Sequence, residues 1–141
     1  MIKRIHHIGV AVENLEAARA FFEENFGIPT SERESFGELD FSFIPLPEAK
    51  LELLQSTTPG GVIRKFIDKK GQGLHHVTFE VDDVQAELDR LKAKGVALIN
   101  EKPYRNAHED LVAFLHPKST YGILIELIQS KANDSSNNIL K

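Results

Sequence analysis

The chain of 141 residues contains no cysteine, which excludes disulfide bonds and thiolate metal ligands and suits a reducing compartment. It also lacks any run of the eighteen or so apolar residues that a membrane-spanning helix needs. Its first residues, MIKRIHHIG, become polar too early for a secretory signal peptide. We therefore expect a cytoplasmic protein with no membrane partner.

Basic charge is scarce as well. The chain has 17 lysines and arginines against 21 acidic residues, which gives a net charge of −4 and no basic stripe. This balance argues against a nucleic-acid partner. A hydrophobic fraction of 41% and a charged fraction of 27% are typical of a globular protein. The length fits one domain, or two small modules that share a core.

Two stretches of the chain resemble each other: IHHIGVAVEN at residues 5–14 and GLHHVTFEVDD at residues 73–83. In each, a His-His pair opens an alternating, strand-like run that ends at an Asn or Asp suited to cap a helix. His7 of the first stretch recurs as His76 of the second. The chain has only six histidines, so the repeat indicates a duplicated module with a period near seventy residues.

Each half of the sequence predicts a β-α-β-β-β order. Asn14 and Asp83 are placed to cap the two helices, and Gly27 and Gly95 are placed to end them. In the first helix, a stripe at helical spacing should face the core, and it consists of Leu15, Ala18, Phe22 and Phe26. The predicted strands span residues 5–12, 31–46, 50–54, 74–81, 96–99, 111–115 and 122–128, with a polar loop at residues 101–110.

The fold class expected from this order is α+β, with two tandem βαβββ modules that form a metal-binding cleft. The two sheets, each covered by a helix on one face, would line that cleft with their other faces. We expect a single domain over residues 1–129. Its parts are modules at about residues 4–58 and 73–129, a linking helical segment at residues 61–70, and a frayed tail at residues 130–141.

Glu126 lies within the apolar run ILIELI, and Glu52 lies within LELL, at corresponding places in the two halves. A buried carboxylate costs several kcal/mol unless a proton, a cation or a metal neutralises it. Two imidazoles and two carboxylates at symmetric positions would suit Zn²⁺, Co²⁺, Mn²⁺, Ni²⁺ or Fe²⁺. The alternative is that each histidine is structural and each glutamate lies at a sheet edge. Strand parity places His6 and His75 on the opposite face, so we interpret them as structural.

The segments IHHIGVAVENLEAA, LHHVTFEVDDV and FLHPKSTYGILIEL resemble the vicinal oxygen chelate (glyoxalase/bleomycin resistance/dioxygenase) superfamily and, within it, the methylmalonyl-CoA epimerases. The resemblance covers about residues 4–129. It implies an α-proton abstraction and reprotonation on an acyl-CoA thioester, with a divalent metal (Co, Mn, Zn or Ni) and a homodimer. The metal ligands that it implies are His7, Glu52, His76 and Glu126.

Epimerisation needs an acid–base group on each face of the α-carbon. Glu126 is our candidate for one group. For the other we consider Glu38, Asp40 and Ser42, which share one strand parity. Asp40 is preferred because some epimerases carry an acidic residue there, and the alternative is a solvated edge residue.

Other functions on the same fold remain open. A glyoxalase I-type lactoylglutathione lyase would use a similar metal set, and a ligand-binding or resistance protein would do no chemistry. An iron extradiol dioxygenase fits less well, because Glu52 would add a fourth protein ligand. The sequence also departs from the epimerases at residues 105–110, RNAHED, where their Gly-Ala-His-Gly stretch keeps only Ala107 and His108. Glycine matters where backbone needs a positive φ or must approach a ligand.

Overall fold

The computed structural model describes residues 1–131, and the predicted tail at residues 130–141 falls outside this range except for its first two residues. The chain divides into two compact units. We call residues 7–75 the N-terminal unit, and residues 1–6 together with those from His76 onward the C-terminal unit. In the described part of the chain, no helix is long and apolar enough to cross a membrane.

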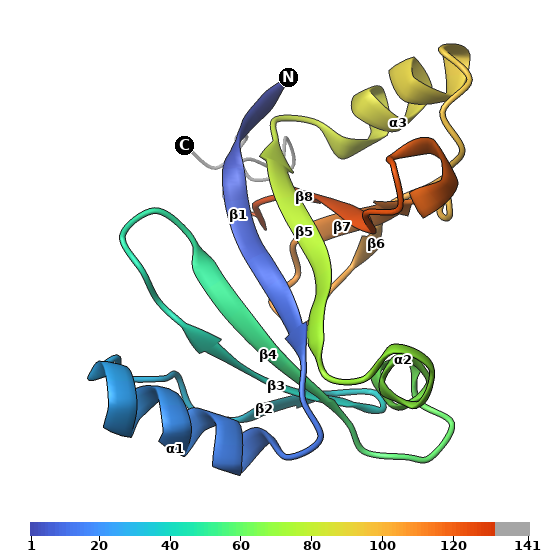
Figure 1. Ribbon diagram of the computed structural model, residues 1–141. Helices are drawn as coiled ribbons and strands as arrows, with labels where there is room; N and C mark the ends of the chain where they lie inside the picture. The colour runs from blue at the N-terminus through green and yellow to red at the C-terminus, as the bar shows by residue number, and fades with distance from the viewer. Residues whose placement is uncertain (132–141) are drawn as a thin grey trace. The chain divides into compact units, whose positions relative to one another are not determined.

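The N-terminal unit contains four strands in the order β2-β3-β4-β1 (Figure 1). The strands β2, β3 and β4 are antiparallel, and β4 pairs with β1 in parallel. The first part of β1 belongs to the C-terminal unit. The elements are β1 (Ile2–Ala11), α1 (Leu15–Phe26), β2 (Glu34–Phe36), β3 (Leu39–Ile44), β4 (Lys50–Ser56) and α2 (Val62–Lys70).

Helix α1 begins and ends as the sequence predicts. The Asn14 side chain accepts a hydrogen bond from the Ala17 backbone N–H, and Gly27 ends the helix with a φ of 65°. The helix packs against β3 and β4 around a core of buried apolar residues. Phe26 is 60% exposed, so its predicted core position is wrong; it is the last residue of the helix. The buried members of this core are Val12, Leu15, Ile44 and Leu53.

The C-terminal unit repeats this arrangement with the strand order β5-β8-β7-β6. The strand β5 pairs with β8 in parallel, and β8, β7 and β6 are antiparallel. Asp83 caps α3, which packs against β7 and β8. The buried core of the C-terminal unit consists of Val81, Val84, Leu88, Ala113, Leu115 and Leu127. The elements are β5 (Gly73–Val81), α3 (Val84–Ala93), β6 (Tyr104–Arg105), β7 (Leu111–Leu115), a 3-10 turn (Pro117–Ser119) and β8 (Ile125–Gln129).

The predicted α+β class and the βαβββ order of each half are confirmed. In both units the strand that precedes the helix pairs in parallel with the last strand of its half. The remaining strands follow as an antiparallel meander. The two units therefore have corresponding strand orders and the same pattern of parallel and antiparallel pairing, as expected of a duplicated module.

The predicted strand at residues 96–99 is wrong. This segment forms only an isolated bridge between Leu98 and Leu115. The backbone N–H groups of Ile99 and Asn100 both donate to the carbonyl of Phe114, so the chain turns away from a regular ladder. The short strand β6 takes its place inside the segment predicted as a polar loop.

Two other predicted strands have different limits. The strand-like segment at residues 31–46 is divided into β2 and β3 by a turn at Gly37, where φ is 59°. The last strand begins at Ile125 rather than at residue 122, because Tyr121 and Gly122 both have positive φ and form a turn. Positive φ is incompatible with an extended ladder.

Candidate metal centre

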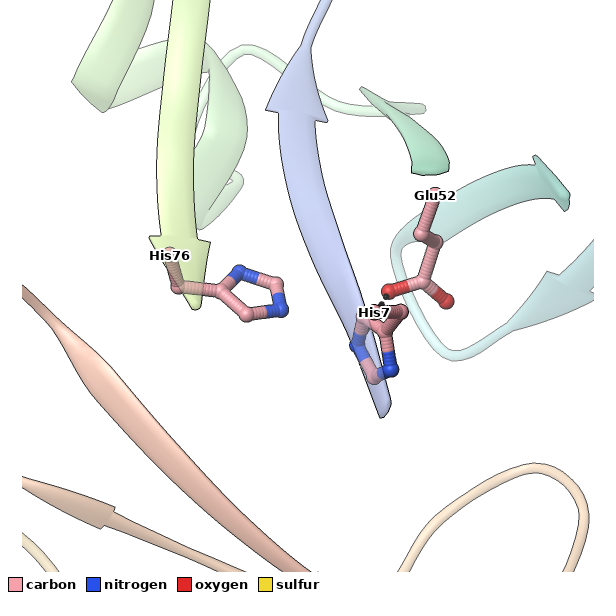
Figure 2. A group of neighbouring side chains, drawn as sticks. All are labelled: His7, Glu52 and His76. Atoms are coloured by element: carbon pink, nitrogen blue, oxygen red, sulfur yellow. Dashed lines mark ion pairs between the residues drawn. The ribbon is translucent and has the colours of Figure 1, made fainter. Parts of the chain in front are cut away.

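His7 and Glu52 lie on one face of the N-terminal sheet. In the parallel pair of β1 and β4, Gly9 stands opposite Glu52, so by strand parity His7 shares the face of Glu52. The Nε2 atom of His7 lies 3.3 Å from Oε1 of Glu52 (Figure 2). His7 is buried, and the Glu52 side chain is 14% exposed. This face is the one that α1 does not cover, because the core residue Leu53 has the opposite parity.

His76 and Glu126 form the corresponding pair in the C-terminal unit. Thr78 stands opposite Glu126 in the parallel pair of β5 and β8, and His76 shares the parity of Thr78. The Nε2 atom of His76 lies 3.5 Å from Oε1 of Glu126. The Thr78 hydroxyl donates a hydrogen bond of 2.7 Å to the same carboxylate oxygen. All three residues are buried, as predicted for Glu126.

An aromatic ring supports each histidine. Phe43 stands opposite Glu52 on β3, and its ring meets the His7 ring edge to face with centroids 6.1 Å apart. Phe114 meets the His76 ring in the same way at 5.8 Å. Such contacts fix the orientation of an imidazole ring.

By strand parity, Lys50 and Tyr104 also lie on these faces. The Lys50 ammonium lies over the Phe43 ring, 5.3 Å from its centroid. Partial burial raises the pKa of Tyr104 to about 12, and the negative charge of Glu126 adds to the increase. The Tyr104 phenol is therefore protonated at any physiological pH.

Asp40 lies on the other face of the N-terminal sheet. It stands opposite Gln55, and its parity on β3 is that of Ile44, which packs beneath α1. Its carboxylate accepts hydrogen bonds from Ser35 (2.5 Å) and Arg33 (2.8 Å). The Ser35 hydroxyl and then the Arg33 guanidinium hold the pKa of this carboxyl below its ordinary value. The structure thus separates Asp40 from the face that carries Glu52, and its catalytic role stays a prediction.

The two other residues considered with Asp40 have distinct positions. Ser42 is fully buried on the same face as Asp40, and its hydroxyl donates to the backbone carbonyl of Ser31. Glu38 is exposed in the turn between β2 and β3. Neither shares the face that carries His7.

The altered loop between β6 and β7 keeps a tight turn without glycine. The Asn106 side chain accepts hydrogen bonds from the backbone N–H groups of His108 and Asp110, each 3.0 Å long. Glu109 takes a φ of 65°, a left-handed conformation that glycine adopts more readily. The side-chain hydrogen bonds of Asn106 and the left-handed backbone of Glu109 thus form this turn without glycine.

Sequence reasoning did not single out Thr78, Phe43, Phe114 or Lys50. Thr78 could have been found, because it lies two residues after His76 and so points to the same side of a strand. The phenylalanines could not, because their proximity to the histidines depends on the register between strands. Lys50 could have been found in the same way as Thr78, because it lies two residues before Glu52 on one strand.

A family model described as the Glyoxalase/Bleomycin resistance protein/Dioxygenase superfamily matches residues 6–114. The chain belongs to this superfamily. Its α+β fold is the glyoxalase-like fold of the family. His7 and Glu52 of the N-terminal unit and His76 of the C-terminal unit are candidate metal ligands. Each of these three residues offers one imidazole nitrogen or carboxylate oxygen to an ion.

Within the superfamily the chain is similar to epimerases along nearly its whole length. The ethylmalonyl-CoA/methylmalonyl-CoA epimerase of Cereibacter sphaeroides is 38% identical over 133 residues, which cover 92% of this chain and 99% of that protein. A structure of a Streptomyces coelicolor methylmalonyl-CoA epimerase variant in complex with 2-nitronate-propionyl-CoA has a TM-score of 0.89 at 29% identity, over 96% of this chain and 99% of that one. The uncharacterized protein YqjC of Bacillus subtilis is also similar, at 34% identity over 134 residues, covering 94% of this chain and 96% of YqjC.

Proposed function

We propose that the protein is a metal-dependent epimerase of methylmalonyl-CoA or of a similar acyl-CoA thioester. The observation that carries the proposal is the imidazole–carboxylate pair, with a buried histidine, that occurs in the same register in both units. The similarity to named epimerases over nine tenths of the chain supports the choice of substrate.

The residues present fit a divalent metal ion. Two imidazoles and two carboxylates form a mixed nitrogen and oxygen donor set that suits Zn²⁺, Co²⁺, Mn²⁺ or Ni²⁺, and we propose His7, Glu52, His76 and Glu126 as the ligands. A bound ion would polarise the thioester oxygen and stabilise the negative charge that develops there when the α-proton leaves. A bound ion would also neutralise carboxylates whose burial is otherwise costly.

Glu126 is the proposed acid–base group on one face of the substrate. Its buried carboxylate can take up the α-proton and return it, provided that one oxygen comes within about 3 Å of that proton. The Thr78 hydroxyl on Oε1 and the nearby His76 ring define how the carboxylate is presented. Because Tyr104 stays protonated at physiological pH, it does not compete with Glu126 for the α-proton.

A second acid–base group must act on the opposite face of the α-carbon, and Asp40 stays our prediction for it. Asp40 is engaged by Ser35 and Arg33, and its parity places it on the α1 side of β3. To exchange a proton with substrate it would have to leave both partners. Measuring exchange and inversion separately tests this, because a chain with one working base exchanges the proton without inverting the centre.

The proposal is tested by incubating the protein, loaded in turn with Co²⁺, Mn²⁺, Zn²⁺ and Ni²⁺, with methylmalonyl-CoA in D₂O. We expect deuterium at the α-carbon and conversion of one epimer into the other. The metal-free protein is the matched control. No exchange with any of the four ions would contradict the proposal.

The same preparations separate the alternatives. A glyoxalase I-type lyase would convert the hemithioacetal of glutathione and be stabilised by glutathione ligands rather than by CoA ligands. A ligand-binding protein would turn over neither. The expected homodimer and cytoplasmic location stay predictions, and the mass of the purified protein in solution tests the first.

A further inference from the structure

The hydroxyl of Thr78 contacts the carboxylate of Glu126. It donates a 2.7 Å hydrogen bond to Oε1 of Glu126, and the Thr78 side chain has no exposed surface. The two residues stand directly opposite each other in the parallel pair of β5 and β8. Register and burial together leave this hydroxyl in a fixed relation to the carboxylate.

The N-terminal unit has no side chain at the corresponding position. Gly9 lies two residues after His7, as Thr78 lies two residues after His76, and it stands opposite Glu52 as Thr78 stands opposite Glu126. A glycine donates nothing from a side chain. The hydroxyl is therefore a feature of one half only, added to an arrangement that the duplication otherwise repeats.

We infer that Thr78 is a positioning residue for Glu126: its hydroxyl holds Oε1, and with it the plane of the carboxylate, in the orientation that metal binding and proton transfer use. The chemical part of this inference rests on the proposed function. A carboxylate is planar, so fixing one oxygen fixes the direction of the other. Proton transfer and metal binding both depend strongly on such geometry.

The test compares Thr78→Val with Thr78→Ser. Valine keeps the shape of threonine without its hydroxyl, and serine keeps the hydroxyl without the methyl group. We expect Thr78→Val to lower kcat by about 10- to 100-fold, because a hydrogen bond to a charged group is lost, with KM changed by less than about threefold. Thr78→Ser should recover most of the loss.

Thr30→Val is a matched control. The Thr30 hydroxyl also donates a 2.7 Å hydrogen bond to a glutamate, Glu23, but outside the candidate metal centre. This variant should keep the wild-type kcat. If Thr78→Val does not fold, Thr78→Ala and Thr78→Ser replace it as a pair that lacks the same methyl group and differs only in the hydroxyl.

Cobalt binding separates this inference from the proposed function. Titration with Co²⁺, followed by the visible spectrum, reports the orientation of the ligands without any substrate. We expect the hydroxyl-free variants to bind Co²⁺ about 10-fold more weakly than Thr78→Ser and with an altered spectrum. If the wild type does not exchange the proton of methylmalonyl-CoA but this difference is found, the substrate is wrong and the positioning role stands. Equal Co²⁺ binding by Thr78→Ser and the hydroxyl-free variants would overturn the inference. If the wild type is active, an unchanged kcat in Thr78→Val would overturn it as well.

Discussion

An imidazole nitrogen lies 3.3 Å from a carboxylate oxygen in the N-terminal unit and 3.5 Å from one in the C-terminal unit, and each imidazole meets a phenylalanine edge to face. The surroundings differ. Thr78 donates a hydroxyl to the carboxylate of Glu126, whereas the position opposite Glu52 is Gly9. The duplicated halves therefore share the imidazole–carboxylate geometry but differ in the hydrogen bonding that supports each carboxylate. The two halves should therefore respond differently to equivalent substitutions.

The largest difference is expected between Glu126→Gln and Glu52→Gln. Replacing the proposed base should lower the rate of α-proton exchange by about 10²- to 10⁴-fold, because an amide cannot accept the proton. Glu52→Gln should mainly weaken metal retention, and saturating Co²⁺ should restore much of the rate. Exchange of methylmalonyl-CoA in D₂O, measured across metal concentrations, checks both. Equal exchange rates and equal dependence on metal concentration in the two variants would contradict the proposed difference between the halves.

The histidines should behave alike in the two halves. His7→Ala and His76→Ala each remove one proposed ligand, so each should lose bound metal in metal analysis of the purified protein. The controls are His6→Ala and His75→Ala, which alter the neighbouring residue of opposite parity and should retain metal. The His75 ring lies edge to face with Phe66 of α2, so its loss should affect stability instead. Full metal content in His76→Ala would contradict the proposed ligand set.

The repeated His-His pattern predicted the duplication, the alternation and helix caps predicted the βαβββ order, and the apolar run around Glu126 predicted its burial. These features depend on residues near one another in sequence: alternation within a strand, and a cap such as Asn14 at the start of a helix. The strand at residues 96–99 could not be excluded from sequence, because its ladder is interrupted by hydrogen bonds to Phe114, fifteen or so residues away.

Asp40 shows the limit of parity without register. The sequence grouped it with Ser42, and the structure keeps them on one face. Which face that is depends on the pairing of β3 with β4, which brings Phe43 rather than Asp40 to the side of Glu52. A local pattern specifies which residues lie together on a strand but not what they oppose.

The start of the third strand offers a further contrast between the halves. Asp40 occupies on β3 the position that Leu111 occupies on β7, counted from the phenylalanine opposite each glutamate. Leu111 packs against the core of its unit, whereas Asp40 is held by Ser35 and Arg33. We expect Asp40→Asn to lower the free energy of unfolding at pH 7 by about 1–3 kcal/mol, because charge-assisted hydrogen bonds are lost.

The pH dependence of this effect has a definite sign. The pKa of Asp40 is lowered in the folded protein from an ordinary value of 3.8, so its contribution is present above about pH 4 and is lost as the pH falls through the lowered pKa. Urea unfolding between pH 7 and pH 3 should show a smaller loss of stability for Asp40→Asn than for the wild type. Glu38→Gln in the adjacent exposed turn is the control. If Asp40→Asn keeps its stability but exchanges the substrate proton without inverting the centre, Asp40 is the second base after all.

The smallest expected effect concerns the turn between the first two strands of each antiparallel meander. The N-terminal unit places Gly37 at a φ of 59°, and the C-terminal unit places Glu109 at 65°. A side chain in this left-handed region is strained, so Glu109→Gly should raise the melting temperature by about 2–4 °C. Gly37→Ala should lower it by a similar amount, although open space surrounds the added methyl group. Glu109 also pairs with Lys131 across the exposed surface, and Lys131→Ala measures that contribution separately. A lower melting temperature for Glu109→Gly, with Lys131→Ala unchanged, would mean that the Glu109 side chain stabilises the turn by contacts that outweigh its backbone strain.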